Sequence, residues 1–282
     1  MIPVPGIWVT LHRVGSDRAA PMDSVRADEN GRYGFRYRRF GDTSAIYFAS
    51  ASYGGIAYFT APFTNPRVAG DDAEIAVYDT TSKPIPIAVR GHHVVVSAVD
   101  ANSQRSITEV FELANDSART RIASGSGRGA ASWSTIVPAG ATGFQVAQGD
   151  LPPTGVTQRD GLVEVFAPIA PGLKQLAFSY SLPASRFPLS IPISEPTQIL
   201  EVLIEEEKGT VTGARLKETN PVSVSNRTFR RFMGVDVPVN SVSVIDLPAA
   251  RRATITSGYM IAITLLIAGA MAAALALALR RR

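Results

Sequence analysis

Apolar and polar residues alternate with a period of two along most of the chain, beginning almost at its first residue. Ile7, Val9 and Leu11 occupy every second position of the stretch IWVTL. This spacing is typical of a β-strand that buries one face. Similar runs recur to about residue 250, separated by turns rich in Gly, Pro and Asn. The pattern therefore predicts an all-β protein of short, mainly antiparallel strands.

The first eighty residues predict a compact set of strands. Residues 32–40 and 73–79 each show strand alternation, and an Asn-Gly dipeptide favours a tight turn before the first of them. The aromatic residues expected on one face of that strand are Tyr33, Phe35 and Tyr37. Residues 46–63 are divided by Gly54-Gly55, a dipeptide suited to a two-residue hairpin turn. We therefore expect an antiparallel meander that includes this hairpin.

Two of these segments resemble a known domain family. The stretch PVPGIWVTL at residues 3–11, followed by DENGRYGFRY at residues 28–37, is similar to the carboxypeptidase regulatory-like domain. The resemblance covers roughly residues 3–80 and implies a small transthyretin-like β-sandwich, which we assign to residues 1–82. It also implies a further strand before the Pro-Val-Pro-Gly turn. We therefore expect the natural chain to begin upstream, with that strand and an export signal. The alternative is a tail-anchored protein whose bulk lies in the cytoplasm.

A second set of strands follows. Residues 83–205 repeat the alternation, for example at Val163 and Val165 on either side of Glu164, and predict a second antiparallel, immunoglobulin-like β-sandwich. Residues 206–250 hold a Lys-Gly hairpin signal and further short strands. They either close the second sandwich or form a membrane-proximal segment of their own.

The C-terminal region contains a long uncharged segment. Residues 258–279 hold no charged side chain over 22 residues, which as a helix would span about 33 Å against a hydrocarbon core of about 30 Å. This predicts a transmembrane helix, with a buried core helix as the alternative. The residues expected to flank the anchor are Tyr259, Arg280, Arg281 and Arg282. The three arginines favour a cytoplasmic C-terminus, and hence a globular part outside the cytoplasm.

Aromatic residues in the hairpin at 46–63 suggest a possible binding surface. Tyr47, Tyr53 and Tyr58 could stack against sugar rings, because an aromatic face offers apolar contact with a polar tip. The alternative is that these tyrosines form core and cross-strand contacts. Solvent exposure separates the two: an open row favours sugar, and a buried row favours core.

Residues with catalytic or metal-binding chemistry are sparse. The chain has no cysteine and three histidines, of which His92 and His93 are adjacent and should face opposite sides of a strand. No nucleophile elbow or Walker motif occurs. The net charge of +4 is spread thinly, without a basic face interleaved with aromatic residues. We therefore expect no enzyme activity, no cofactor, no metal site and no nucleic-acid partner.

These features together predict a single-pass protein of the bacterial cytoplasmic membrane. Two β-sandwich modules would lie at the extracytoplasmic surface and serve binding, scaffolding or assembly. The expected partners are the lipid bilayer and another membrane or envelope protein. Carbohydrate binding through the hairpin at 46–63 is the alternative function. An enzyme would require a concave pocket that gathers acidic or histidine residues from distant strands.

Overall fold

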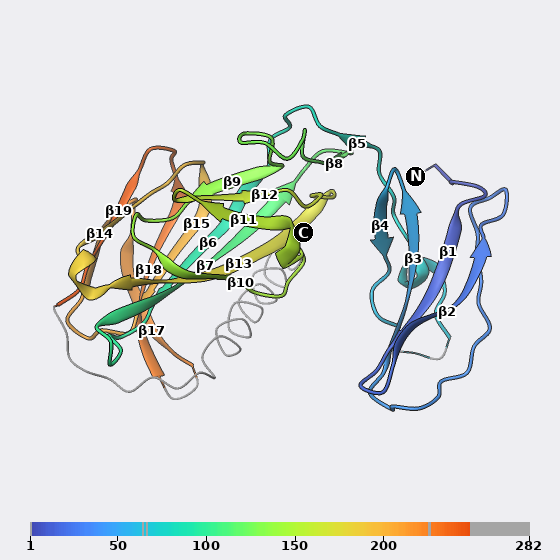
Figure 1. Cartoon of the computed structure of the whole chain (residues 1–282), viewed down its shortest axis with the longest axis horizontal. Coiled ribbons are helices and arrows are strands. Elements are labelled where there is room, and N and C mark those ends of the chain that lie inside the picture. The colour runs from blue at the N-terminus through green and yellow to red at the C-terminus, as the bar shows by residue number, and fades with distance from the viewer. Residues whose placement is uncertain (1, 64, 66, 225–226, 249–282) are drawn as a thin grey trace. The chain divides into compact units, whose positions relative to one another are not determined.

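The computed structural model of the protein describes residues 2–248, except residues 64, 66 and 225–226 (Figure 1). The described part is all-β, with nineteen strands and three short 3₁₀ turns, so the predicted fold class is confirmed at this level. The chain divides into two compact units. The N-terminal unit comprises the residues up to Thr81 together with Ala118–Thr120, and the C-terminal unit comprises the other described residues.

The N-terminal unit is built on one antiparallel sheet with the strand order β2-β1-β3-β4. Its strands are β1 (Trp8–Val14), β2 (Ala19–Arg26), β3 (Ile46–Tyr53) and β4 (Ile56–Phe59). Strand β1 pairs with β2 on one side and β3 on the other, so it is an internal strand. Gly54 and Gly55 join β3 to β4 with φ values of 56° and 79°, which glycine adopts without strain. The predicted hairpin is confirmed.

The inner face of this sheet carries a small apolar core. Val9, Ala49 and Ala51 are buried there, and half-buried aromatic and aliphatic side chains pack over them. Some of these side chains come from residues 32–40 and 73–79, which were predicted to be strands. Neither segment belongs to a β-ladder among the described residues, so both strand predictions are wrong. Alternation of side chains requires only an extended, half-buried backbone, whereas a strand also requires a hydrogen-bonded neighbour.

The C-terminal unit contains a seven-stranded sheet with the order β10-β13-β7-β6-β15-β18-β17. Its strands are β6 (Ala88–Val96), β7 (Gln104–Asn115), β10 (Thr142–Val146), β13 (Gly172–Pro183), β15 (Thr197–Ile204), β17 (Lys217–Val224) and β18 (Arg227–Val237). Neighbouring strands are antiparallel except β6 and β15, which are parallel. The predicted antiparallel pairing therefore does not extend to this pair, whose strands are separated by a long stretch of chain that supplies strands to both layers.

Two three-stranded sheets, β11-β12-β9 and β14-β19-β16, form the second layer of this unit. Their strands are β9 (Trp133–Ile136), β11 (Val156–Arg159), β12 (Leu162–Val165), β14 (Leu189–Pro192), β16 (Thr210–Gly213) and β19 (Val242–Asp246). One core joins the layers: Phe178 and Val202 of the large sheet belong to the same buried cluster as Trp133, Val163 and Ile245. This arrangement is compatible with a β-sandwich.

Short elements complete the described chain. They are the strands β5 (Thr80–Thr81) and β8 (Thr120–Arg121), which pair with each other, and the 3₁₀ turns η1 (Gly70–Ala73), η2 (Pro153–Gly155) and η3 (Ala184–Arg186). The region 206–248 adds β17 and β18 to the large sheet and β16 and β19 to the second layer. These strands thus share the core of the C-terminal unit.

The predicted transmembrane helix at 258–279 lies outside the described residues, as do its flanking residues Tyr259, Arg280, Arg281 and Arg282. Across the part of the chain that is described, no helix combines the length and apolar character needed to cross a bilayer. The membrane segment accordingly remains a prediction from sequence.

Candidate functional site

The three tyrosines predicted as a sugar platform do not form an open row. Tyr47 and Tyr58 are buried on the inner side of the sheet, with exposed fractions of 1% and 6%. The Tyr47 hydroxyl accepts a hydrogen bond from the Arg13 guanidinium, at 3.2 Å. The Tyr58 hydroxyl donates to the Tyr78 carbonyl, at 3.0 Å. By the exposure criterion, these two side chains serve the core and not an external ligand.

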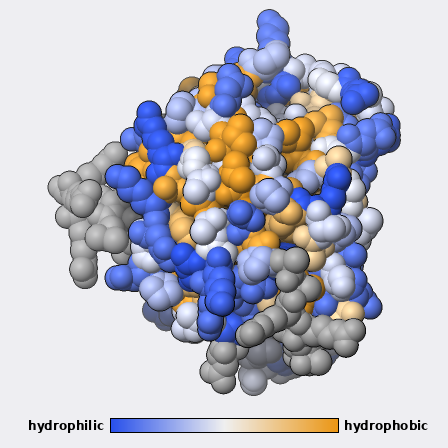
Figure 2. Space-filling model, turned by 90° about the vertical axis from the view of Figure 1, so that its left-hand side faces the viewer, coloured by the Kyte–Doolittle hydropathy of each residue, from blue (hydrophilic) through white to orange (hydrophobic). Residues whose placement is uncertain are grey.

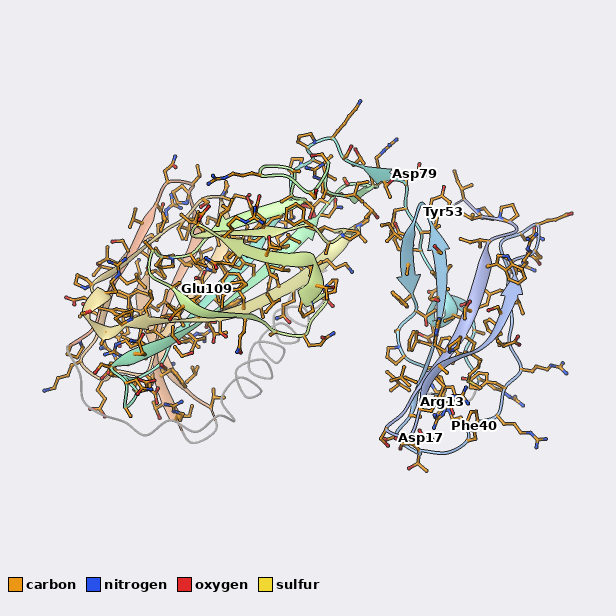
Figure 3. All side chains as sticks on the ribbon, in the orientation of Figure 1. Arg13, Asp17, Phe40, Tyr53, Asp79 and Glu109 are labelled. Carbon is orange, nitrogen blue, oxygen red and sulfur yellow. The ribbon has the colours of Figure 1, made fainter. Side chains whose placement is uncertain are left out.

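Tyr53 differs from the other two because it is only partly buried. Its hydroxyl donates to a carboxylate oxygen of Asp79 at 3.0 Å, and Figure 3 labels both residues. This hydrogen bond raises the pKa of the Tyr53 hydroxyl, because the phenolate form would face the negative charge of Asp79. Tyr53 therefore fixes the chain near the end of the hairpin.

Another set of aromatic residues lies on the outer face of the same sheet. Trp8 and Phe59 are 53% and 58% exposed, and His12 and Phe48 lie opposite each other on β1 and β3. Successive side chains of a strand point to opposite faces, so the residue next to a buried tyrosine points outward. We call this outer surface of β1–β4 the open face. The sequence alone could have indicated this face: if Val9 and Leu11 point into the core, the alternation of the strand directs Trp8 outward.

The aromatic rings of the open face contact one another. His12 stacks on Phe48 with ring centroids 5.0 Å apart, and Phe48 meets Phe59 edge to face at 5.8 Å. Between β1 and β2, the Arg26 guanidinium lies 4.9 Å from the centroid of the Trp8 ring. These contacts hold the rings in place before any ligand arrives.

Hydroxyl groups occupy the positions between these rings. Thr10 Oγ1 lies 2.9 Å from Ser24 Oγ, and His12 Nε2 lies 2.8 Å from Ser50 Oγ. Among the described residues of the four strands, Arg26 is the only Lys, Arg, Asp or Glu that the register places on this face. The open face can therefore bind a neutral ligand that has apolar surfaces and polar edges, without forming a covalent bond.

A cavity of about 260 Å³ lies at one end of the same unit. It is lined by Arg13, Arg18, Ala20, Pro21, Met22 and Phe40. The buried Arg13 donates through Nη2 to both carboxylate oxygens of Asp17, at 2.9 and 3.0 Å, and its guanidinium lies 4.7 Å from the Phe40 ring centroid (Figure 3). The hydrogen bond from Arg13 lowers the pKa of Asp17, so the pair stays ionised at neutral pH.

Glycines make room for this ion pair. A Cβ on Gly41 would lie 2.5 Å from Asp17 Oδ2 and 2.8 Å from Arg13 Nη2, and Gly41 also has a φ of +68°. Arg13 Nε further donates to the Phe40 carbonyl at 3.2 Å. The Arg13 side chain is thus engaged by groups of its own unit, and its main effect is to close the end of the sheet.

In the C-terminal unit, the adjacent histidines of β6 lie on opposite faces, as their spacing predicts. His92 faces the core, where its Nε2 lies 2.7 Å from Glu109 Oε2 and its ring stacks on Phe111 at 4.0 Å. The Tyr180 hydroxyl donates to the other oxygen of Glu109 at 2.6 Å, and Glu109 is 1% exposed (Figure 3). Burial, followed by the charge of Glu109, raises the pKa of Tyr180 well above its usual value.

His93 belongs to a separate polar cluster. Its Nδ1 lies 2.6 Å from Glu201 Oε2, its Nε2 lies 3.6 Å from Glu112 Oε1, and Glu201 accepts a hydrogen bond from Arg231 at 2.5 Å. Burial opposes protonation of His93, but the nearby carboxylate of Glu112 and the hydrogen bond with Glu201 outweigh it and raise the pKa to about 9. A Cβ on Gly91 would lie 2.9 Å from the Glu112 carboxylate, so glycine makes room for this cluster.

Neither histidine cluster offers an evident reaction centre. Their carboxylates and histidines bond to one another and are largely buried, and none of these residues lines the cavity near Arg13. Within residues 2–248, apart from the gaps, no group of three His, Cys, Asp or Glu side chains is arranged to hold a metal ion. These clusters instead fix the pairing of the strands that carry them.

Apolar residues also reach the surface of the C-terminal unit, among polar ones (Figure 2). Val235, Val239 and Val242, which lie at or between the ends of β18 and β19, are each exposed by at least 43%. They are aliphatic and carry no associated hydroxyl network. The open face of the N-terminal unit therefore offers the more specific chemistry.

In comparisons with known proteins, neither a protein-family model nor a curated protein matches the chain. The structure itself defines the class: an all-β protein of two compact units. Its most distinctive surface is the open face, where aromatic rings and hydroxyl groups are exposed together.

Proposed function

We propose that the protein is a non-catalytic binding and scaffolding protein held at the extracytoplasmic surface of a bacterial cytoplasmic membrane. The observation that carries the binding role is the open face, where Trp8 and Phe59 are exposed by more than half on an ordered sheet. Exposed aromatic patches of this kind mark interaction sites more often than isolated apolar residues do. The partners would be the bilayer and a neighbouring membrane or envelope protein.

The membrane attachment rests on the sequence of residues 258–279. An uncharged segment of this length is favourably inserted, and the arginines at 280–282 favour a cytoplasmic end. A single anchor confines the two units to the membrane plane and raises their effective concentration toward partners in the same membrane. This arrangement suits scaffolding better than diffusion-limited turnover of a soluble substrate.

The N-terminal unit is proposed to be a carboxypeptidase regulatory-like domain. The stretches at residues 3–11 and 28–37 support this assignment. The four-stranded sheet is compatible with one layer of a transthyretin-like sandwich. Assignment to the family identifies a scaffold only, because related folds carry unrelated functions.

Carbohydrate binding is the second candidate, and one observation favours it. The open face places the hydroxyls of Thr10 and Ser50 between the Trp8 ring and the His12–Phe48 pair. Pyranose rings need such apolar platforms with hydrogen-bonding groups beside them. The site would therefore use outward-facing residues instead of the buried tyrosines of the hairpin.

Membrane attachment is tested with charges placed in the predicted helix. We expect the full chain to stay with bacterial membranes during alkaline carbonate extraction. The double substitution L265R/L266R should release it, because each central arginine costs about 3 kcal/mol of insertion free energy. The matched variant L265V/L266V should remain bound. Release of the unmodified chain by carbonate would refute the anchor.

Carbohydrate binding is tested by tryptophan fluorescence in the W133F background, which leaves Trp8 as the only tryptophan. Soluble mixed-linkage β-glucan and cello-oligosaccharides serve as neutral probes, and an anionic polyuronate serves as a charged comparison. Sugar binding should shift the Trp8 emission, and F59A should weaken it about tenfold if one stacking contact supplies about 1.4 kcal/mol. An unchanged emission with every glycan would remove this candidate and leave the scaffolding role.

A further inference from the structure

Two extended segments of the N-terminal unit have no backbone partner. Residues 33–38 and 75–77 form no backbone hydrogen bond with any other described residue, whereas β1–β4 are joined in one antiparallel sheet with β2 and β4 at its edges (Figure 1). Backbone N–H and C=O groups in partly buried chain are paired in the great majority of cases. Unpaired extended segments are therefore places where a ladder can still form.

The side chains of these segments already follow strand geometry. Tyr33, Phe35 and Tyr37 are half-buried, and the residues between them are exposed. Ile75 and Val77 are also half-buried. Four of these five side chains, Tyr33, Phe35, Ile75 and Val77, pack on the same inner cluster of the sheet. The first segment thus has the alternation of a strand, whereas in the second Ala76 is half-buried as well, and both segments lack a backbone neighbour.

The layer of side chains that covers the small core is itself only half-buried. The fully buried members of the core are Val9, Ala49 and Ala51, two of which are alanines, while the side chains packed over them are all half-buried. The Tyr37 hydroxyl is enclosed and has no hydrogen-bond partner among the described residues. The half-buried side chains of this layer therefore keep apolar surface that a further strand could bury.

Two other sheet edges in the described chain carry features that discourage strand addition. Strand β2 contains Pro21 beside a register shift, and β17 contains Pro221 beside another. Such prolines and bulges protect a sheet edge from a passing strand. Residues 33–38 and 75–77 contain no proline, so their backbone donors remain available.

The outward side of the first segment is positively charged. Arg36 and Arg38 are exposed and form no ion pair among the described residues, and Arg32 is exposed at the start of the segment. Opposite charges on neighbouring strands stabilise their pairing. A strand lying beside this segment would therefore favour acidic residues at its outward positions and small apolar residues at its inward positions.

We propose that these two segments accept an extended strand of another polypeptide. The strand pairs with the free backbone groups of residues 33–38 and 75–77, and its alternate apolar side chains bury the exposed parts of the half-buried apolar layer formed by Tyr33, Phe35, Ile75 and Val77. Its outward positions carry Glu or Asp, which face Arg36 and Arg38. This inference rests on the proposed binding function and deepens it by naming the partner as an acidic–apolar alternating strand.

The test uses the full chain in detergent micelles and the synthetic peptide Ac-EVEVEVE-NH2. Amide hydrogen exchange is followed by mass spectrometry. At a peptide concentration about ten times the dissociation constant, exchange at residues 33–38 and 75–77 should slow about tenfold. The same peptide with N-methylated valines keeps its side chains but loses ladder donors, so it should give no protection.

Two variants of the chain itself test whether the backbone of residues 33–38 accepts the strand. R36P removes a backbone donor and should abolish the protection, whereas R36A keeps the donor and should weaken it only in part. Exchange of β1 and β3 amides reports whether either variant still folds. If R36P disturbs those strands, the N-methylated peptide on the unmodified chain decides the question.

Several results would overturn the inference. They are slow exchange of both segments before peptide is added, equal protection by the N-methylated peptide, protection at β2 or β4 instead, and protection that grows with chain concentration alone, which would indicate a second copy. Carbonate extraction does not depend on these amides. A chain that stays in membranes but ignores the peptide therefore refutes this inference and leaves the proposed function standing.

Discussion

His93 should make the stability of the C-terminal unit depend on pH. Its pKa is raised from 6.5 to about 9 by the nearby carboxylate of Glu112 and the hydrogen bond with Glu201, which outweigh the effect of burial. A shift of this size corresponds to about 3 kcal/mol of extra stability for the protonated folded state. Because the folded pKa is above the unfolded one, this contribution is complete below about pH 6.5 and disappears as pH rises through 9.

The neighbouring carboxylate does not interfere in that window. Interaction with His93 lowers the pKa of Glu201 despite its burial, so Glu201 stays ionised from neutral pH upward. Arg231 donates a hydrogen bond to the other carboxylate oxygen of Glu201. The change in stability between pH 6 and 10 therefore reports mainly the loss of the His93 proton.

The assay is urea denaturation in the W8F background, where fluorescence reports only Trp133, which is buried in the core of this unit. The unmodified protein should lose about 3 kcal/mol of unfolding free energy between pH 6 and 10. H93Q should be destabilised at pH 6 and show a flat profile over the same range. The control H12Q, which alters the open face, should keep the unmodified slope. A parallel decline in H93Q and the unmodified protein would refute this account of the cluster.

Two further substitutions test the packing of each unit. G41A should destabilise the N-terminal unit by about 1–3 kcal/mol, because it adds a Cβ beside Asp17 at a positive φ. G34A, with open space around the added Cβ, should change stability by about 0.5 kcal/mol or less. Thermal unfolding of both variants tests this, and equal midpoints would contradict it. Y180F should cost the C-terminal unit about 1.5–3 kcal/mol by removing the hydrogen bond to buried Glu109; urea denaturation at pH 7 measures it, and an unchanged midpoint would show that this bond adds no net stability.

The parts of the fold that the sequence predicts are those with local causes. Gly54-Gly55 determines its hairpin because both residues adopt positive φ, which depends on glycine and not on distant partners. Residues 32–40 illustrate the limit of such reasoning. Their alternation correctly indicates an extended, half-buried chain, but a ladder requires a neighbour that the local pattern does not specify.

The candidate site shows the same limit. Choosing Tyr47 and Tyr58 by residue type overlooks that both occupy inward positions, while the register turns Phe48 and Phe59 outward. A one-residue offset decides between core and surface in any strand. The alternation around Trp8 contains that information, and the cross-strand pairs make it explicit.

Contacts between distant residues are the least accessible from sequence. Glu201 meets His93 across 108 positions, and neither residue lies in a motif that signals the other. The parallel pairing of β6 with β15 is equally non-local. Only the three-dimensional arrangement shows that two adjacent histidines serve two separate carboxylate clusters.

The parallel pairing of β6 and β15 has a consequence during translation. About 100 residues separate the two strands, so a ribosome adding 5–20 residues per second makes β6 wait roughly 5–20 s for that neighbour. During this interval β6 can pair with β7 along one edge, while its other edge has no partner strand. Chaperone capture or delayed collapse of the emerging chain would be most valuable in those seconds, before β15 arrives.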